Sequence, residues 1–439
     1  MSVRLTDPFD VDVVVVGAGF TGLTVASALQ RAGVSFIVLE ARDRVGGKTE
    51  AQQDATGRLV DTGGQFVNDD MPDVLALASA AGATRVMAVH PGHAVTVPPP
   101  TDSDPWQEAV DLLGALGIAQ LDDNRTVMEW AVALDVEQNV RNAIRSAVNG
   151  ANCHDARIIP LSTLAQFNLR TPMQAEELQS WFIDTMHSLA LHLAAPLSGQ
   201  IRVNCPVRAV HLHDQSVDVV ALDQVWHCRE VVAAVPPTAY AHLHITPPLP
   251  DDIAAAARAF SPGTVIKFLL RYQDPFWLDH GRNGIGQFLA PPGIYFADVS
   301  APGAPSLVGF VGGTTAMEWQ RHSPAQRREA ILHHAADAFG PEAQQPLSVL
   351  ERLWAPDEWG GGGYSNVQTT HLPTATDTLV AGLPLLTFAS TELAPQFPGY
   401  VEGAIRAGTV AAAEVLRRLG RQGPNQQGGA GSSPPDLQY

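Results

Sequence analysis

Residues 13–22 read VVVVGAGFTG, and this stretch decides the fold that the sequence predicts. Four consecutive valines are typical of a buried parallel strand, and three glycines follow them at the spacing GxGxxG. Beyond the glycines, the Ala- and Leu-rich residues 24–33 predict a helix that ends at Gly33, and residues 35–40 (SFIVLE) predict a second strand. Strand, glycine turn, helix and strand in this order form one βαβ unit, which is right-handed by the usual rule.

Each glycine of the turn has its own role in binding a dinucleotide. Gly17 permits the tight turn, Gly19 lets the backbone reach a pyrophosphate, and Gly22 lets the helix pack closely on the strand. The pyrophosphate would face the start of the helix, where free N–H groups and the helix dipole favour an anion. Glu40 ends the second strand, where its carboxylate can accept hydrogen bonds from both ribose hydroxyls. The unit therefore predicts a site for NAD or FAD.

The bulk composition narrows the class of protein further. The chain has 439 residues, which favours two domains, and its 45% hydrophobic and 16% charged residues are typical of a globular protein. A net charge of −18 argues against nucleic acid or an anionic membrane surface as the main partner. The three cysteines form no CxxC pair, and no apolar run is long enough to span a membrane, so we expect a cytoplasmic protein. The histidines lack the ligand spacing of a metal site, so no bound metal is expected.

The remaining patterns predict an α/β fold class with two interleaved domains. A discontinuous, Rossmann-like cofactor domain resembling that of glutathione reductase would comprise residues 1–85, 200–255 and 375–420. An α+β substrate-binding domain would comprise residues 86–199 and 256–374. The Gly-, Gln-, Ser- and Pro-rich residues 421–439 predict a disordered tail. Helical patterns stand at residues 135–148, 175–197, 324–339 and 401–420, and strand-like runs stand at 201–221, 230–235, 264–272, 285–290 and 306–313.

The stretch after Glu40, ARDRVGGKTE (41–50), resembles the flavin amine oxidases, whose familiar version runs LEARxRVGGR. Lys48 replaces the last arginine of that version, which keeps the positive charge and loses the bidentate fork. The resemblance extends from about residue 10 to residue 418. Its further motifs are DTGGQFV (61–67), NCPVRAV (204–210), VVAAVPPTAY with ITPPLP (231–250) and FASTELAPQFPGYVEGAIRAG (388–408).

This resemblance implies FAD as the cofactor and assigns residues to it. Val207 would hold the adenine through its backbone, Glu392 would lie along the ribityl chain, and Trp354 would be an aromatic beside the flavin. Independently, Tyr400 and Val401 open the last helix, whose free N–H groups would stabilise negative charge on a reduced flavin. The residues expected to bind FAD are Gly17, Gly19, Phe20, Thr21, Gly22, Glu40, Ala41, Arg42, Gly47, Lys48, Gly63, Gly64, Gln65, Phe66, Val207, Trp354, Glu392, Tyr400 and Val401.

Three residues are expected to be catalytic. Lys267 falls on the active-site lysine of the family, whose implied role is a water-mediated contact with flavin N5 linked to oxygen activation. A solvent-facing strand position is the alternative for Lys267, but the residues on its side of the strand are apolar, which favours an inward position. Tyr364 and Tyr400 fall on the two positions of the aromatic cage of the family, although either tyrosine alone could be ordinary packing.

The glycine run in WGGGGYSNV (359–367) precedes the first cage tyrosine. In the mitochondrial monoamine oxidases, the residue before that tyrosine is a cysteine bonded to the flavin, whereas here it is Gly363. The resemblance therefore implies a non-covalent FAD, with the glycine backbone close to the flavin ring. One departure lies elsewhere, because a Gly-Gly pair common in the family corresponds to Asp184-Thr185.

The implied reaction is oxidation of a small-molecule amine. The amine would pass a hydride equivalent from its α-carbon to flavin N5, the imine would hydrolyse to an aldehyde or ketone, and O2 would be reduced to hydrogen peroxide. The motif QFPGY is closer to bacterial amine and nicotine-type oxidases than to the mitochondrial enzymes, which favours secondary or cyclic amines. The alternatives are an L-amino-acid oxidase, with Arg170 as the carboxylate-binding residue, a related flavin desaturase or dehydrogenase, and a non-catalytic flavoprotein. A homodimer is an open expectation.

Overall fold

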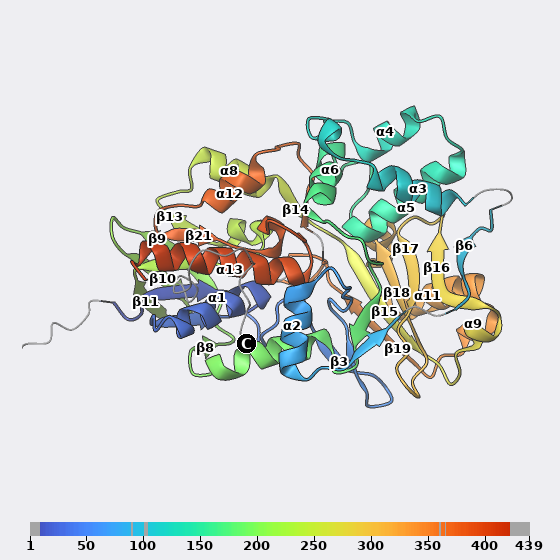
Figure 1. Cartoon of the computed structure of the whole chain (residues 1–439), viewed down its shortest axis with the longest axis horizontal. Coiled ribbons are helices and arrows are strands. Elements are labelled where there is room, and N and C mark those ends of the chain that lie inside the picture. The colour runs from blue at the N-terminus through green and yellow to red at the C-terminus, as the bar shows by residue number, and fades with distance from the viewer. Residues whose placement is uncertain (1–8, 89–90, 101–103, 360, 365, 422–439) are drawn as a thin grey trace, which may run out of the picture.

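A computed structural model describes residues 9–88, 91–100, 104–359, 361–364 and 366–421. The predicted tail at 421–439 lies outside the described residues except for Arg421. The elements form two halves that lie side by side in Figure 1, with the first glycine turn in the half that contains both α1 and α13.

The first half is built on a parallel five-stranded sheet with the order β21-β12-β1-β2-β8. In register, Val14 of β1 lies between Val231 of β12 and Ile37 of β2. The sheet therefore joins strands from the beginning, the middle and the end of the chain. The strands are β1 (Val13–Val16), β2 (Phe36–Leu39), β8 (Ile201–Arg202), β12 (Glu230–Ala233) and β21 (Leu386–Phe388).

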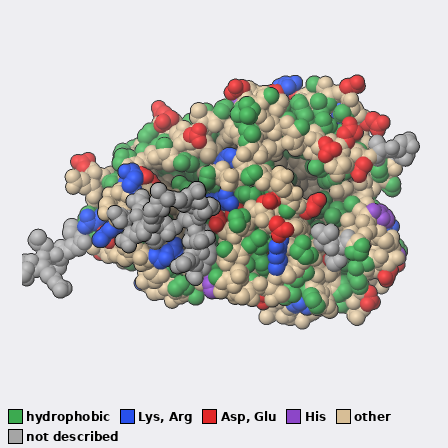
Figure 2. Space-filling view, in the orientation of Figure 1, with side chains coloured by type: hydrophobic (Ala, Val, Ile, Leu, Met, Phe, Trp, Pro, Cys, Tyr) green, Lys and Arg blue, Asp and Glu red, His purple; other side chains and the backbone are tan. Residues whose placement is uncertain are grey.

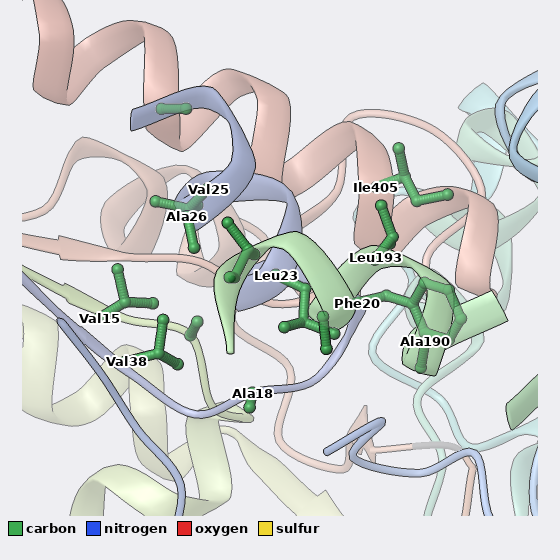
Figure 3. Packing of buried hydrophobic residues seen from close by; sticks show 14 of the residues in the cluster. Val15, Ala18, Phe20, Leu23, Val25, Ala26, Val38, Ala190, Leu193 and Ile405 are labelled. Atoms are coloured by element: carbon green, nitrogen blue, oxygen red, sulfur yellow. The ribbon is translucent and has the colours of Figure 1, made fainter. Parts of the chain in front are cut away.

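Helices cover one face of this sheet, and a second sheet lies on the other side. Figure 3 shows side chains of the first face, where Val15 and Val38 of the sheet lie below Leu23 of α1, and Ile405 of α13 lies beside Leu193 of α7 in the same cluster. The helices of this face are α1 (Phe20–Arg31), α2 (Pro72–Ala81), α7 (Met186–Ala194) and α13 (Val401–Arg418). The other side has β9 (Val207–Leu212), β10 (Val217–Ala221), β11 (Gln224–Cys228) and β13 (His244–Thr246), with α8 (Asp251–Arg258) and α12 (Ala375–Ala381).

The second half contains a six-stranded mixed sheet with the order β19-β15-β18-β17-β16-β6. Among the described residues of this sheet, β6 pairs with β16 in parallel, and the other neighbouring strands pair antiparallel. The strands are β6 (His93–Val97), β15 (Val265–Arg271), β16 (Arg282–Phe288), β17 (Ile294–Asp298), β18 (Ser306–Gly312) and β19 (Ser348–Leu353). The helices of this half are α3 (Pro105–Gly114), α4 (Val127–Ala133), α5 (Gln138–Asn152), α6 (Leu161–Arg170), α9 (Phe276–Asp279), α10 (Gly313–Trp319) and α11 (Pro324–Phe339).

The remaining elements are short. Three two-stranded ribbons pair β3 (Ala51–Gln53) with β4 (Leu59–Asp61), β5 (Arg85–Met87) with β7 (Ser180–Phe182), and β14 (Phe260–Pro262) with β20 (Asn366–Gln368). The 3-10 turns are η1 (Ile118–Gln120), η2 (Ala195–Leu197), η3 (Pro237–His242), η4 (Pro341–Gln344) and η5 (Thr391–Leu393). Among the described helices, none has the length and apolar character needed to cross a membrane.

The helix predicted over residues 175–197 is wrong in its first half. Residues Ser180–Phe182 form β7, all three are buried, and the strand pairs with β5. Thr185 ends this segment with φ of +74°, which a continuous helix cannot contain, and its hydroxyl caps α7 by accepting from the Ser188 N–H at 3.3 Å. Helix α7 then packs on α1 and α2, so it lies with the cofactor half although the sequence division assigns residues up to 199 to the other half.

The strand predicted at 264–272 occurs as β15, but it does not alternate between buried and exposed positions. All of its residues are buried, because the strand lies between β18 and β19 and is covered on both faces. Two charged residues, Lys267 and Arg271, are therefore enclosed with the apolar ones. Arg271 is paired with Asp54, its Nε lying 2.9 Å from Oδ2.

Candidate active site

A long cleft with about 1350 Å³ of space runs along the carboxyl ends of β1 and β2 and continues to the start of α13. Ligands of doubly wound folds bind outside the carboxyl ends of parallel strands, so the position agrees with the sequence prediction. The predicted residues that line this cleft are Gly17, Gly19, Phe20, Thr21, Glu40, Ala41, Arg42, Gly47, Lys48, Gly64, Val207, Tyr364, Glu392, Tyr400 and Val401.

The glycine turn is packed as its sequence predicts. Gly17 has φ of +99°, in the region that favours glycine, and a Cβ on Gly22 would lie 2.0 Å from the Gly17 carbonyl oxygen. Gly22 itself does not line the cleft, because its role is to let α1 approach the turn. A Cβ on Gly47 would lie 3.1 Å from Gly19 Cα, so the two glycine loops touch. No side chain caps the start of α1, which leaves its first N–H groups open to an anion.

Glu40 organises the ribose end of the cleft. Its buried carboxylate accepts from the Ala18 N–H at 2.7 Å and from the Arg42 N–H at 2.9 Å, one bond to each oxygen. Each oxygen keeps a lone pair that can accept a ribose hydroxyl. The Arg42 guanidinium is paired with Asp357 at 2.6 Å, which ties the segment before the glycine run to the phosphate loop.

Two buried polar atoms of the cleft residues have no hydrogen-bond partner among the described residues. They are Lys48 Nζ and Ser390 Oγ. Burial lowers the pKa of Lys48, while the Glu392 carboxylate, whose Oε1 lies 3.6 Å from Nζ, opposes that shift. Unpartnered buried polar atoms are costly in an empty protein, and a polar ligand such as the pyrophosphate and ribityl part of FAD would satisfy them. The residues present therefore fit FAD.

Lys267 lies behind the cleft wall and does not line it. Its Nζ is buried and donates to the Gly63 carbonyl at 2.8 Å and to Gln65 Oε1 at 2.7 Å. Gly64 lines the cleft, whereas the predicted residues Gly63, Gln65 and Phe66 beside it in the chain do not. Trp354 is another supporting residue, because it is buried and its Nε1 donates to the Thr62 carbonyl at 3.0 Å.

Asp61 is a functional candidate that sequence analysis missed. Its carboxylate is buried and accepts from the Met186 N–H at 2.8 Å, at the start of α7. Burial raises the pKa of Asp61 to about 7, and the nearby Lys267 charge opposes that rise. Burial also lowers the pKa of Lys267, and the Asp61 charge opposes that fall. The motif DTGGQFV begins with this residue, but nothing in the motif points to a lysine that follows far along the chain.

The two predicted cage tyrosines lie at the same end of the cleft. Tyr364 Oη donates to the Gly150 carbonyl at 2.5 Å, and Tyr400 Oη donates to Glu177 Oε1 at 2.6 Å. Burial raises the pKa of Tyr364, and the charges of Cys153, Glu177 and Tyr400 add to the rise. Phe310 connects the cage with the lysine, because its ring centroid lies 6.2 Å from that of Tyr364 and 5.8 Å from Lys267 Nζ.

The described part of the glycine run packs against the protein itself. Gly361 and Gly362 have φ of +57° and +94°. A Cβ on Gly363 would lie 2.5 Å from Val265 Cγ1 and 3.4 Å from Cys153 Sγ. None of these three glycines lines the cleft, and close packing on β15 and its neighbours requires them. Their closeness to the flavin ring stays a prediction. Cys153 is distant from Gly363 in sequence but close to it in the fold. It is buried and does not line the cleft.

Several lining residues were not predicted. Most come from the turn after β12, from the segment before the glycine run and from the turn before α13, and the others lie in β1, β2, the loop after β2 and α13. The sequence signal for the first group was the motif VVAAVPPTAY, whose individual residues were not assigned. The unpredicted lining residues are Val16, Leu39, Thr49, Ala234, Val235, Pro236, Ala239, His242, Leu243, Glu358, Trp359, Ser390, Thr391 and Ala404.

The glycine turn, the acid after β2 and the helix start at Val401, all on one cleft, define a dinucleotide-binding flavoprotein. The chain belongs to the family of flavin containing amine oxidoreductases, whose model matches residues 20–99 and 136–416. The protein is thus an oxidoreductase that acts on amines, and its cofactor is FAD.

Relatives agree over nearly the full length. An L-amino acid dehydrogenase of Synechocystis sp. is 26% identical over 93% of this chain and 95% of its own. The flavin-containing amine oxidase A of Sus scrofa is 26% identical over 94% of this chain and 86% of its own. The solved structure of cyclohexylamine oxidase from Brevibacterium oxydans superposes with a TM-score of 0.87 at 26% identity, covering 94% of this chain and 100% of that one.

Proposed function

We propose that this protein oxidises a small-molecule amine that carries a hydrogen on its α-carbon, with O2 as the electron acceptor. The observation that carries the proposal is the pair Tyr364 and Tyr400 at one end of the FAD cleft, with Lys267 behind the wall beside them. When bound, FAD supplies the chemistry by accepting a hydride equivalent from the α-carbon and passing two electrons to O2, which yields an imine and hydrogen peroxide. The imine would hydrolyse to an aldehyde or ketone.

The roles of the protein in this proposal are binding and orientation. Glu40 and the N-terminus of α1 would hold the ribose and the pyrophosphate, and Lys48 with Glu392 would contact the middle of the cofactor. The N-terminus of α13, at Val401, would stabilise negative charge on the flavin side. The proposal includes no covalent bond to FAD, because Gly363 stands before the cage tyrosine and the nearby Cys153 is outside the cleft lining.

The two tyrosine rings would orient the amine between their faces and exclude water from it. Both phenols are held by hydrogen bonds, Tyr364 to Gly150 and Tyr400 to Glu177, which limits the freedom of the rings. Burial raises the pKa of both phenols, so they stay neutral and cannot act as bases at ordinary pH. In this scheme Lys267 acts in the oxygen half of the reaction, from its buried position against Gly63 and Gln65.

An amino acid substrate is the second candidate, because one relative is named an L-amino acid dehydrogenase. Such a substrate needs a cationic side chain for its carboxylate. Arg170 is the sequence candidate, but its guanidinium donates to the carbonyl oxygens of Glu392 at 3.0 Å and Ala394 at 3.1 Å. Those bonds occupy the arginine in joining α6 to η5, which favours amines without a carboxylate.

The test is an anaerobic titration of the FAD-loaded protein with primary, secondary and cyclic amines, polyamines and L-amino acids. We expect one or more amines to bleach the flavin absorbance, and readmission of air to restore it with formation of hydrogen peroxide. Bleaching by L-amino acids alone would favour the second candidate. If no amine bleaches the flavin, the proposed reaction is wrong. The three free cysteines, Cys153, Cys205 and Cys228, agree with a reducing compartment, and we propose the cytoplasm.

A further inference from the structure

A glutamate stands at the substrate side of the aromatic cage, in a segment that the FAD cleft does not use. Glu177 lies in the loop between α6 and β7, and its Oε1 accepts from Tyr400 Oη at 2.6 Å. Its side chain is accessible to solvent, yet burial raises its pKa. Figure 2 shows that the face in view is hollowed beneath the upper helices, with acidic side chains along the lower edge of the hollow.

The surroundings of Glu177 are aromatic and carry no compensating positive charge. Burial is the largest cause of the raised pKa of Tyr295, Tyr364 and Tyr400, and the charge of Glu177 adds to each rise. All three phenols therefore lie near this carboxylate. Phe167 adds another ring, with its centroid 6.4 Å from that of Tyr400. Among the described residues, the only polar partner of Glu177 is the Tyr400 hydroxyl, and no lysine, arginine or histidine of that part of the chain forms an ion pair with it.

The three cationic side chains that were considered for the cleft and the cage each have another partner in the protein. Arg170 donates to the carbonyls of Glu392 and Ala394, Lys267 donates to Gly63 and Gln65, and Lys48 lies beside Glu392. A carboxylate-bearing substrate would therefore meet the Glu177 charge without a cation to offset it. A substrate with a second ammonium group would instead supply the missing partner of Glu177.

We propose that Glu177 is a specificity-determining residue that selects substrates by charge, favouring amines with a second cationic group and disfavouring amines that carry a carboxylate. The proposal rests on the proposed function, because it names the substrate class of the same site. Its physical basis is that opposite charges attract and like charges repel most strongly where aromatic walls exclude part of the water. The hydrogen bond from Tyr400 fixes the carboxylate next to the cage, so that its charge acts on whatever the cage holds.

The experiment compares three ligands of the same chain length, namely an n-alkylamine, the α,ω-diamine and the ω-amino acid, over a series of lengths. Their dissociation constants are measured anaerobically on the FAD-loaded protein from the perturbation of flavin absorbance, alongside the rate of any bleaching. We expect the wild type to bind diamines more tightly than alkylamines, and alkylamines more tightly than ω-amino acids. In Glu177→Gln, the preference for diamine over ω-amino acid should fall by about tenfold or more, since about 1.4 kcal/mol corresponds to a factor of ten.

Matched variants separate charge selection from a structural effect. Glu176→Gln removes the same charge one residue away, where no hydrogen bond reaches the cage, and should leave the preference nearly unchanged. Glu177→Asp keeps the charge and should keep most of the preference. A general loss of structure would weaken all three ligands alike and leave their ratio unmoved.

The failure of this proposal differs from the failure of amine oxidation. If Glu177→Gln leaves the ligand ratio unchanged, or if Glu176→Gln lowers it equally, Glu177 is not the selecting residue, even when amines bleach the flavin. If no ligand bleaches the flavin, amine oxidation is refuted, while the ratio of dissociation constants still decides whether Glu177 selects by charge.

Discussion

Replacing Lys267 by methionine tests the buried charge pair behind the cleft. Methionine keeps the length of the side chain but removes a charge whose Nζ donates to the Gly63 carbonyl at 2.8 Å and to Gln65 Oε1 at 2.7 Å. It also leaves the buried Asp61 carboxylate without the positive charge that offsets its desolvation. Leaving a buried charge without its compensating charge costs about 3–5 kcal/mol, and we expect Lys267→Met to lower the free energy of unfolding by this amount.

A second substitution should recover part of that loss. Asp61→Asn removes the negative charge, while its amide oxygen can still accept from the Met186 N–H that now donates at 2.8 Å. In the double variant, neither charge remains to be compensated. Its cost should therefore be smaller than the sum of the two single costs by about 1–3 kcal/mol.

The loss in Lys267→Met should depend on pH. The pKa of Asp61 is raised to about 7 from the ordinary value of 3.8. At a pH between these two values, the folded protein therefore holds a proton on Asp61 that the unfolded chain has released. Stability attributable to this group therefore falls as the pH rises through that window. Without the Lys267 charge the Asp61 pKa should rise further, which extends the window upward. Lys267→Met should then be more destabilising at about pH 8 than at about pH 6.

The assay is urea unfolding followed by circular dichroism, at a fixed excess of FAD, at both pH values and for all four proteins of the cycle. The double variant carries neither titrating group, so its free energy of unfolding should change less between the two pH values than that of Lys267→Met. An equal loss for Lys267→Met at both pH values, together with additive single costs, would refute the coupling of Asp61 with Lys267.

Further predictions concern the cofactor. Gly22→Ala would place a Cβ 2.0 Å from the Gly17 carbonyl oxygen and should abolish FAD retention, at a cost of about 3 kcal/mol, whereas Gly114→Ala, with no atom within 4 Å of the new Cβ, should retain FAD. Normal flavin content in Gly22→Ala after purification would contradict the packing of the turn. Lys267→Met should slow reoxidation of the reduced enzyme by O2, measured by stopped flow, more than it weakens FAD binding; unchanged reoxidation removes its proposed role. Heat or acid should release the FAD into the supernatant, and yellow colour in the precipitated chain would show a covalent bond.

Local patterns in the sequence were sufficient for the cofactor end of the site. The buried valines of β1, the spacing of Gly17, Gly19 and Gly22, and the acid at Glu40 each follow from the geometry of a single βαβ unit. That unit is short, and its contacts are made between neighbours in sequence, so periodicity and residue type carry the information. The 175–197 segment shows the limit, because tertiary pairing of β7 with β5 overrode a helical pattern.

The substrate end could not be derived in this way. The Lys267 contacts with Gly63 and Gln65, and the Tyr400 contact with Glu177, each join segments that are far apart in the chain.

The sequence by itself determined the βαβ unit and its dinucleotide chemistry, because these depend on local spacing, whereas the cage tyrosines were predicted only from the resemblance to the flavin amine oxidases. Only the tertiary structure decided that Lys267 lies behind the cleft wall, that Asp61 offsets its charge and that Glu177 meets the cage. The physical reason is that charge pairing and desolvation depend on which distant segments pack together, and that packing is a property of the whole core.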